Sequence, residues 1–205
     1  MAEEIGRIEK PSVDDYVGGR KLILVPLIFS GQDAPKDFQE RYERYWQEAK
    51  HQIHNLEEKL GAVTSVFHEM IFDDGENGMK FIEQLNPESH QIIKSLSERG
   101  AKFQSVEEAE LTQECMDWER CFMVAVGSKV KSRVSEFYVE SRSKRYQHVS
   151  AKIDELLEEG GLGLLFVRED HQAQFPMDVK VFNVYPPALD EINRWLRDYA
   201  KQGMG

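Results

Sequence analysis

Long apolar runs are missing from this chain of 205 residues. No run approaches the roughly 20 apolar residues that a helix needs to cross a bilayer. Residues 1–15 also contain no apolar signal region. From these absences we expect a cytoplasmic protein with no membrane role.

Cysteine is scarce, with Cys115 and Cys121 the two in the sequence. Both fall in one expected helix, where their spacing separates the Cα atoms by roughly 9 Å. That separation is too large for a disulfide within the chain, and it suits a reducing compartment. Without a CxxC spacing we interpret them as two helical thiols rather than a metal or redox pair.

Several familiar catalytic motifs are also missing. The sequence has no GxxxxGK[ST] phosphate loop, no GxGxxG after a strand, no GxSxG elbow and no Cys/His cluster at zinc spacing. His68 and Glu69 match the first half of a zinc-protease motif, but Phe72 stands where the second histidine is required. We therefore expect no metal and no cofactor, and whether the protein is an enzyme stays open.

The chain is acidic, with a net charge of −11 and a pI of about 5.1. An acidic surface repels nucleic acid and anionic membranes, so such a role needs a local basic patch. One stretch has that character, because residues 129–152 hold seven basic and two acidic side chains. Contact with RNA or the ribosome would use this stretch, and nucleic acid is not expected elsewhere.

Apolar segments of strand length and composition alternate with helical patterns near both ends of the chain. The expected strands are residues 21–29, 62–72, 162–167 and 179–184. This alternation predicts an α/β fold with a sheet of about four strands flanked by helices. The loop at 169–177 is short for a parallel crossover, so we expect the last two strands to pair antiparallel and the sheet to be mixed.

Two long helices are expected in the middle of the chain. Ser105 and Glu108 have the spacing of a capping box, which predicts a helix start at Val106. A second helix from 129 to 159 would be some 45 Å long, more than a small sheet covers. We therefore predict a helical hairpin or arm, about 105–159, inserted into the sheet domain.

Few signals in the sequence divide the chain into domains. Residues 1–19 are polar and are expected to form a flexible lead-in. No linker, repeat or low-complexity segment separates the remainder. Residues 20–205 are therefore expected to form one α/β domain that includes the arm.

The polar loop after the third expected strand is the best candidate for a site, since open α/β sheets place ligands at the carboxyl ends of strands. Asp170 and His171 are the catalytic candidates, because a histidine beside a carboxylate can act as a general base. The candidate ligand-binding groups are polar side chains of this loop and of the arm: Glu119, Arg142, Arg145, His148, Gln172 and Gln174.

An alternative interpretation makes these residues structural. Glu119 falls by helical angle within an apolar arc, so its carboxylate needs a partner. It would then pair with Arg142 or Arg145, and residues 169–174 would be an ordinary polar loop.

Three functions follow as hypotheses. The first is a non-enzymatic protein that self-associates or binds a protein partner through its arm, most simply as a twofold dimer. The second is a hydrolase or transferase that acts on a small anionic ligand at the 169–174 loop, held by an arginine. The third is an RNA- or ribosome-associated protein that uses the basic stretch at 129–152.

Overall fold

A computed structural model describes residues 18–31 and 33–202. Most of the expected lead-in, residues 1–17, lies outside the described residues. The strands, in chain order, are β1 (Lys21–Pro26), β2 (Ser65–His68), β3 (Lys102–Phe103), β4 (Leu162–Val167) and β5 (Lys180–Asn183). The helices are α1 (Lys36–Leu60), α2 (Gly75–Leu85), α3 (Pro87–Glu98), α4 (Ala109–Val124), α5 (Ser128–Leu156) and α6 (Pro187–Gln202).

The five strands form one sheet in the order β3-β2-β4-β1-β5, and every pairing is parallel. The α/β class and the helical arm inserted before β4 are confirmed. The expected mixed sheet is wrong. The last two strands are not neighbours, because β1 lies between them and pairs in parallel with each. The loop after β4 returns along the face covered by α5 to the amino end of β5, which lies beside the start of β1, and it forms no hairpin.

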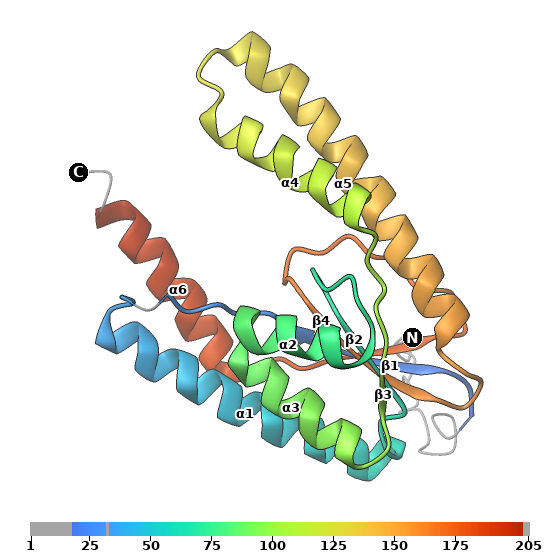
Figure 1. Cartoon of the computed structure of the whole chain (residues 1–205). Helices are drawn as coiled ribbons and strands as arrows, with labels where there is room; N and C mark the ends of the chain where they lie inside the picture. The colour runs from blue at the N-terminus through green and yellow to red at the C-terminus, as the bar shows by residue number, and fades with distance from the viewer. Residues whose placement is uncertain (1–17, 32, 203–205) are drawn as a thin grey trace, which may run out of the picture.

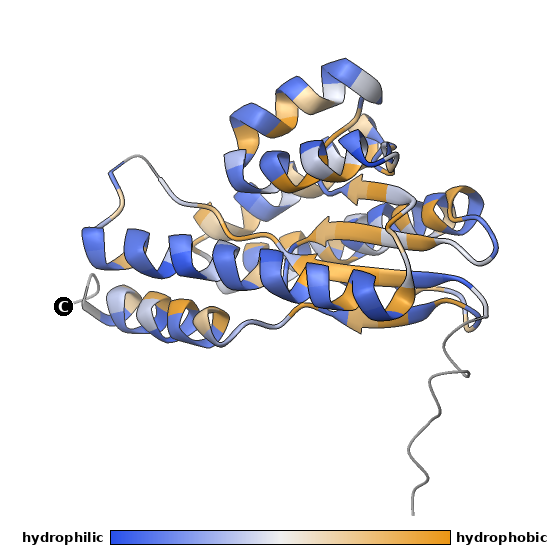
Figure 2. Ribbon diagram, turned by 90° about the horizontal axis from the view of Figure 1, so that it is seen from below, coloured by the Kyte–Doolittle hydropathy of each residue, from blue (hydrophilic) through white to orange (hydrophobic). Residues whose placement is uncertain are grey.

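Helices cover both faces of the sheet (Figure 1). One face packs against α1, α2, α3 and α6, with Ile23, Trp46 and Leu164 among the buried residues. The other face packs against the second half of α5, through Tyr146 and Ile153. Figure 2 shows apolar strands enclosed by helices whose outer surfaces are hydrophilic, which is the pattern of a three-layer α/β protein.

The arm consists of α4 and the first half of α5, which pack against each other and project from the sheet (Figure 1). The predicted second helix at 129–159 is confirmed as α5, which ends earlier, at Leu156. The predicted capping box is wrong. Helix α4 begins at Ala109, and its cap residue Glu108 makes no side-chain capping hydrogen bond. Within the described residues, no helix is both long and apolar enough to cross a membrane.

The start of α3 follows local chemistry closely. The Asn86 side chain accepts a hydrogen bond from the Ser89 backbone N–H at 3.0 Å, and Pro87 occupies the first position of α3. These are the positions that Asn and Pro favour at a helix start. The short strand β3 has no counterpart among the expected strands.

Candidate functional site

The carboxyl ends of β1, β2 and β4 meet at one edge of the sheet because the strands are parallel. After β1 the chain turns to the face covered by α1. After β4 it turns to the opposite face, where Ala173 and Phe175 pack against the core beneath α5. Neighbouring strands whose connections leave toward opposite faces open a crevice at this edge, which is where α/β proteins commonly bind ligands.

Glu69 follows β2 at this edge and is buried. Its Oε1 accepts hydrogen bonds from Arg145 Nη2 at 2.9 Å, from the Tyr146 hydroxyl at 3.0 Å and from Arg168 Nε at 3.2 Å. Its Oε2 accepts the backbone N–H of Arg168 at 2.6 Å. This carboxylate therefore joins the ends of β2 and β4 to the middle of α5.

Glu107 precedes α4 and is the second buried carboxylate. Its Oε2 accepts Arg145 Nε at 3.0 Å and the Thr112 hydroxyl at 2.8 Å. Its Oε1 accepts Arg145 Nη2 and the backbone N–H of Met70 at 3.1 Å. Met70 has a positive φ of 70°, an uncommon conformation for a residue other than glycine. The hydrogen bond to Glu107 holds the chain in that turn.

Glu69, Glu107, Arg145 and Arg168, named here the ion cluster, contain two carboxylates and two guanidinium groups. Burial by itself would lower the pKa of Arg145, but the hydrogen bond and charge of Glu107, with the charge of Glu69, raise it. The charge of Glu69 likewise raises the pKa of Arg168 against the effect of burial. Both arginines stay cationic, so the ion cluster is charge-balanced.

A second layer of polar contacts surrounds the ion cluster. Glu119 lies 3.4 Å from Arg168 Nη1 and accepts the Tyr138 hydroxyl at 3.3 Å. Arg142 donates to the Asp170 carboxylate at 2.7 Å and also to the Asp170 carbonyl oxygen. The structural alternative had Glu119 pairing with Arg142 or Arg145, and its partner is instead Arg168.

His171 is the one catalytic candidate that faces a cavity at the crevice. The cavity has a volume of about 390 Å³, and the residues that line it come from β1, β4, β5 and the loops after them: Leu24, Pro26, Val167, Arg168, Glu169, His171, Asn183, Val184 and Tyr185. Its size falls in the range of small-molecule sites. Burial lowers the pKa of His171, and Nδ1 is enclosed without a hydrogen-bond partner in the described part of the chain.

The other candidates lie away from this cavity. Gln172 and Gln174 line a hollow of about 680 Å³ on the opposite side of the loop, beside α5. The Gln174 backbone N–H donates to Ser150 Oγ at 3.1 Å, which fixes the loop against that helix. His148 is half-buried on α5 and takes no part in the contacts of the ion cluster. The structure therefore brings Glu119, Arg142, Arg145 and Asp170 around one cluster but separates Gln172, Gln174 and His148 from His171.

The ion cluster contains two buried carboxylates, of Glu69 and Glu107, that are not among the site residues predicted from the sequence. Glu69 fits half of a zinc-protease motif in the sequence, and Glu107 lies between the two capping-box positions, Ser105 and Glu108. A charged side chain between apolar neighbours at a strand end is the one signal available for Glu69. No local signal marks Glu107, because its partner Arg145 is 38 residues further along the chain.

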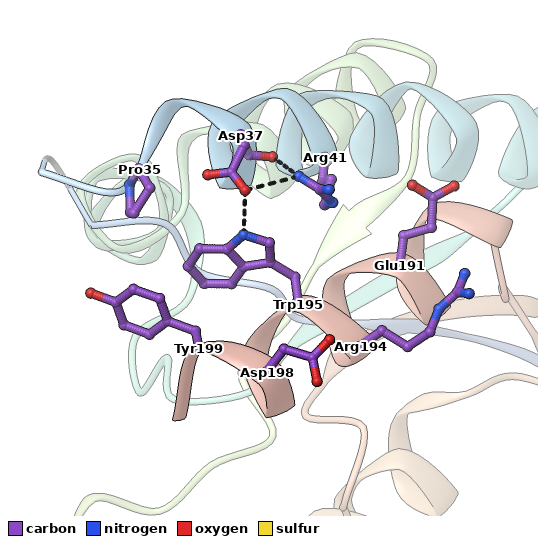
Figure 3. A pocket seen from close by; sticks show the side chains of 8 residues that line it. All are labelled: Pro35, Asp37, Arg41, Glu191, Arg194, Trp195, Asp198 and Tyr199. Atoms are coloured by element: carbon purple, nitrogen blue, oxygen red, sulfur yellow. Dashed lines mark hydrogen bonds and ion pairs between the residues drawn. The ribbon is translucent and has the colours of Figure 1, made fainter. Parts of the chain in front are cut away.

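A third hollow, of about 620 Å³, is lined by residues from the start of α1 and from α6 (Figure 3). Trp195 donates its indole N–H to Asp37, packs against Phe38 at a ring distance of 4.8 Å and stacks on Tyr199 at 4.7 Å. Arg41 also binds the Asp37 carboxylate, at 3.4 Å. These contacts fasten α6 to α1, and we interpret the hollow as the outer margin of that helix contact.

The arm tip, defined as residues 123–130, carries a concentration of exposed apolar side chains. The exposed fractions are 78% for Met123, 76% for Val124, 97% for Val126 and 58% for Val130. Below the tip, Trp118 stacks on Phe137 at a ring distance of 4.7 Å, so an aromatic contact joins the two helices. The tip itself is left without cover from the described chain.

Most of the basic stretch at 129–152 is paired. Five of its seven cations lie beside carboxylates: Arg133 with Glu136, Arg142 with Asp170, Lys144 with Glu140, Arg145 with Glu69 and Glu107, and Lys152 with Glu155. Lys131 lies over the Phe122 ring, 4.9 Å from its centroid. The Arg142 and Arg145 side chains are also withdrawn from solvent, so these two cations are not available to a phosphate backbone.

Among the described residues, no group of three His, Cys, Asp or Glu side chains is placed to hold a metal ion. Comparison with protein-family models, curated proteins and solved structures finds no match for this chain.

Proposed function

We propose that this protein is a non-enzymatic binding protein that associates with copies of itself through the arm tip. The observation that carries the proposal is the uncovered apolar surface of Met123, Val124, Val126 and Val130 at the far end of a projecting hairpin. Contiguous exposed apolar side chains on a soluble chain are typical of protein-interaction surfaces.

The base of the arm supports this role because it is rigid. Arg145 connects α5 to both buried carboxylates of the ion cluster, and Tyr146 packs in the core of the sheet. From Ser128 to Tyr146, α5 extends about 27 Å along its axis at a rise of ~1.5 Å per residue. A hairpin held firmly at one end presents its tip well clear of the sheet.

The ion cluster favours a structural over a catalytic role. Its carboxylates and guanidinium groups bind one another, and each carboxylate oxygen accepts at least one hydrogen bond. A general base needs a carboxylate with a lone pair that is free to accept a proton from a ligand, and an anion site needs a guanidinium N–H that is free to donate to one. The arginines assigned by sequence to an anionic ligand are occupied here.

Self-association is tested by placing a charge on the tip. The double variant Val126→Asp with Val130→Asp should raise the dimer dissociation constant at least about tenfold, because burying an unpaired carboxylate is costly. The measurement is molar mass by light scattering over a range of concentrations. Met177→Asp is the matched control, since Met177 is fully exposed on a loop of the body.

The proposal is wrong if the unaltered chain remains a strict monomer at high concentration. It is equally wrong if the tip variant and the Met177→Asp control associate as strongly as the unaltered chain. Val126 and Val130 are exposed, so their substitution leaves the folded core intact and the comparison concerns association alone.

A second candidate function rests on the cavity at the crevice. His171 lines this cavity, and its lowered pKa favours the neutral ring, which can accept a proton or a hydrogen bond. A panel of nucleotides, small carboxylates and sugars in a thermal-shift assay is the test. A compound at 100 times its dissociation constant should stabilise the fold by about 2.7 kcal/mol, and His171→Ala should abolish that shift while His148→Ala preserves it.

A further inference from the structure

The arm has an uneven charge distribution along its length. Residues 109–119, at its base, contain four carboxylates and no basic side chain. Residues 120–133, which include the arm tip, contain four basic side chains and no carboxylate. The charge of α4 and of the segment that follows it therefore changes from acidic at the base to cationic at the tip.

The base carboxylates share one surface of α4. Glu110, Glu114 and Asp117 follow the i, i+4, i+7 spacing of a single helix face, and all three are exposed. The same face continues toward the tip through the exposed Cys121 and Val124. One side of the helix thus changes from acidic to apolar between the base and the tip.

The charged tip also acts independently of the body of the molecule. The Debye length is about 8 Å at physiological ionic strength. The tip lies about 27 Å of helix beyond the point where α5 enters the core, at ~1.5 Å per residue. The acidic body therefore does not cancel the positive charge of the tip.

We infer that two arms pair side by side in antiparallel orientation about a twofold axis, so that the cationic tip of one copy lies against the acidic base of the other. This inference rests on the proposed self-association and specifies its geometry. A parallel pairing would place four positive charges against four, and four negative charges against four. The antiparallel pairing makes both ends attractive and places the apolar tip of each copy beside the arm of its partner, where Phe137 and Val139 are exposed.

The ion pairs within one arm do not remove this complementarity. Arg133 lies 2.6 Å from Glu136, and Arg120 lies 3.5 Å from Asp117, with every side chain in both pairs exposed. Exposed pairs of this kind contribute little to stability and exchange partners readily. Their charges stay available to a second copy.

A second copy fits the arm better than a polyanion does. A nucleic acid or an anionic membrane would attract the tip, but the base carboxylates would repel it. It would also leave the base without a partner. Another copy of the chain supplies both missing charges from one surface, and it has apolar side chains to contact Val126 and Val130.

Charge reversal tests the orientation. The tip variant is Lys129→Glu with Arg133→Glu, and Lys131 is kept because it lies over the Phe122 ring. The base variant is Glu110→Lys with Asp117→Lys, and Glu114 is kept because it accepts the Trp118 indole N–H. The control, Lys80→Glu with Lys94→Glu, makes the same change in net charge as the tip variant at exposed positions of the body.

Light scattering at about 50 mM salt should show the dimer dissociation constant raised about tenfold or more in the tip variant and in the base variant. The chain that carries all four substitutions should return to within about threefold of the original value, because the reversed charges again attract. The control should match the unaltered chain. Thermal melting of each variant checks that α4 and α5 are intact.

Three outcomes overturn the inference. If Val126→Asp with Val130→Asp prevents association but the combined charge variant stays as weak as its parents, the arms associate in another orientation and the proposed function stands. If the charge variants associate as the unaltered chain does, the charge pairing is wrong and only the apolar contact remains. A strict monomer rejects both the inference and the proposed function.

Discussion

Arg145 Nη2 lies 2.9 Å from Glu69 Oε1, joining the middle of α5 to the end of β2 across 76 residues of chain. Both side chains are 2% exposed. The same guanidinium binds Glu107, which leads into α4. Arg145 therefore fixes the base of the arm to the sheet. Removing its side chain should loosen the contacts of α5 with Glu69 and with Glu107.

The first prediction concerns that arginine. Arg145→Ala should lower the free energy of unfolding by about 3–5 kcal/mol, because it leaves the buried Glu107 without a cation and Glu69 with Arg168 alone. Lys144→Ala should leave it nearly unchanged, since the Lys144–Glu140 pair is exposed. Urea unfolding followed by the fluorescence of the buried Trp46 measures both. Equal effects of the two substitutions would contradict the assignment of the cluster as a structural element.

The second prediction separates two interpretations of one short segment. A capping box would make Glu108 important for α4, whereas the structure buries Glu107 against Arg145 and leaves Glu108 exposed. Glu107→Ala should cost about 3 kcal/mol or more of unfolding free energy. Glu108→Ala should cost less than about 0.5 kcal/mol. The same urea titration measures both substitutions. A larger loss of unfolding free energy for Glu108→Ala than for Glu107→Ala would support the capping box instead.

Residues 105–108 show why a local pattern can predict a capping box that the fold does not form. Ser105 has the residue type of a cap, but its hydroxyl donates to the Ile71 carbonyl oxygen at 2.7 Å instead of capping a helix. Val106 is buried in the core beneath α5. The contact with Ile71 is non-local, and sequence spacing carries no record of it. Tertiary packing here overrides a good local signal.

At the level of the fold, periodicity was sufficient for the class and the arm. Apolar runs of strand length and the long helix at 128–156 follow from local composition, so both were predictable. The order of the strands in the sheet was not predictable from local composition. The loop after β4 is short, and a short loop favours a hairpin only if the two strands are neighbours. Nothing local indicates that β1 inserts between them.

The candidate site was predictable in its location but not in its pairing. The loop after β4 does lie at the carboxyl edge, and His171 does line a cavity there. The partners of Arg142, Arg145 and Glu119 depend on how the arm leans against the sheet. That angle is set by the burial of Tyr146 and Val149, and helical spacing alone does not give it.

The third prediction concerns Gly78, in the first turn of α2. A Cβ atom at this position would lie 2.1 Å from the Asp73 backbone oxygen and 2.6 Å from the Phe103 ring. Because a backbone oxygen cannot rotate away, Gly78→Ala should lower the free energy of unfolding by about 3 kcal/mol. Gly31→Ala is the reference, since nothing lies within 4 Å of its Cβ position, and it should stay within about 0.5 kcal/mol. A stable Gly78→Ala protein would mean that α2 starts elsewhere.

The last prediction uses His68, which is buried at the end of β2. Its Nδ1 lies 2.6 Å from the backbone oxygen of Glu69, so Nδ1 carries the hydrogen, and its Nε2 lies 3.1 Å from Ser89 Oγ. Burial lowers the pKa of His68 to about 4, against the raising effect of the Glu69 carbonyl. The folded protein therefore holds a neutral ring at pH values where the unfolded chain is protonated.

The sign of the pH effect follows from proton counting. Between pH 6.5 and about 4 the unfolded state binds more protons at His68 than the folded state does, so stability falls as the pH falls through that range. The full loss is about 3 kcal/mol, from ~1.36 kcal/mol per pH unit. Urea unfolding between pH 7.5 and 4.5 measures it. His68→Gln should remove this part of the pH dependence, whereas His54→Gln, at an exposed position on α1, should retain it. If the unfolding free energy of the two variants has the same slope against pH, His68 is not the buried neutral group that the contacts with Glu69 and Ser89 indicate.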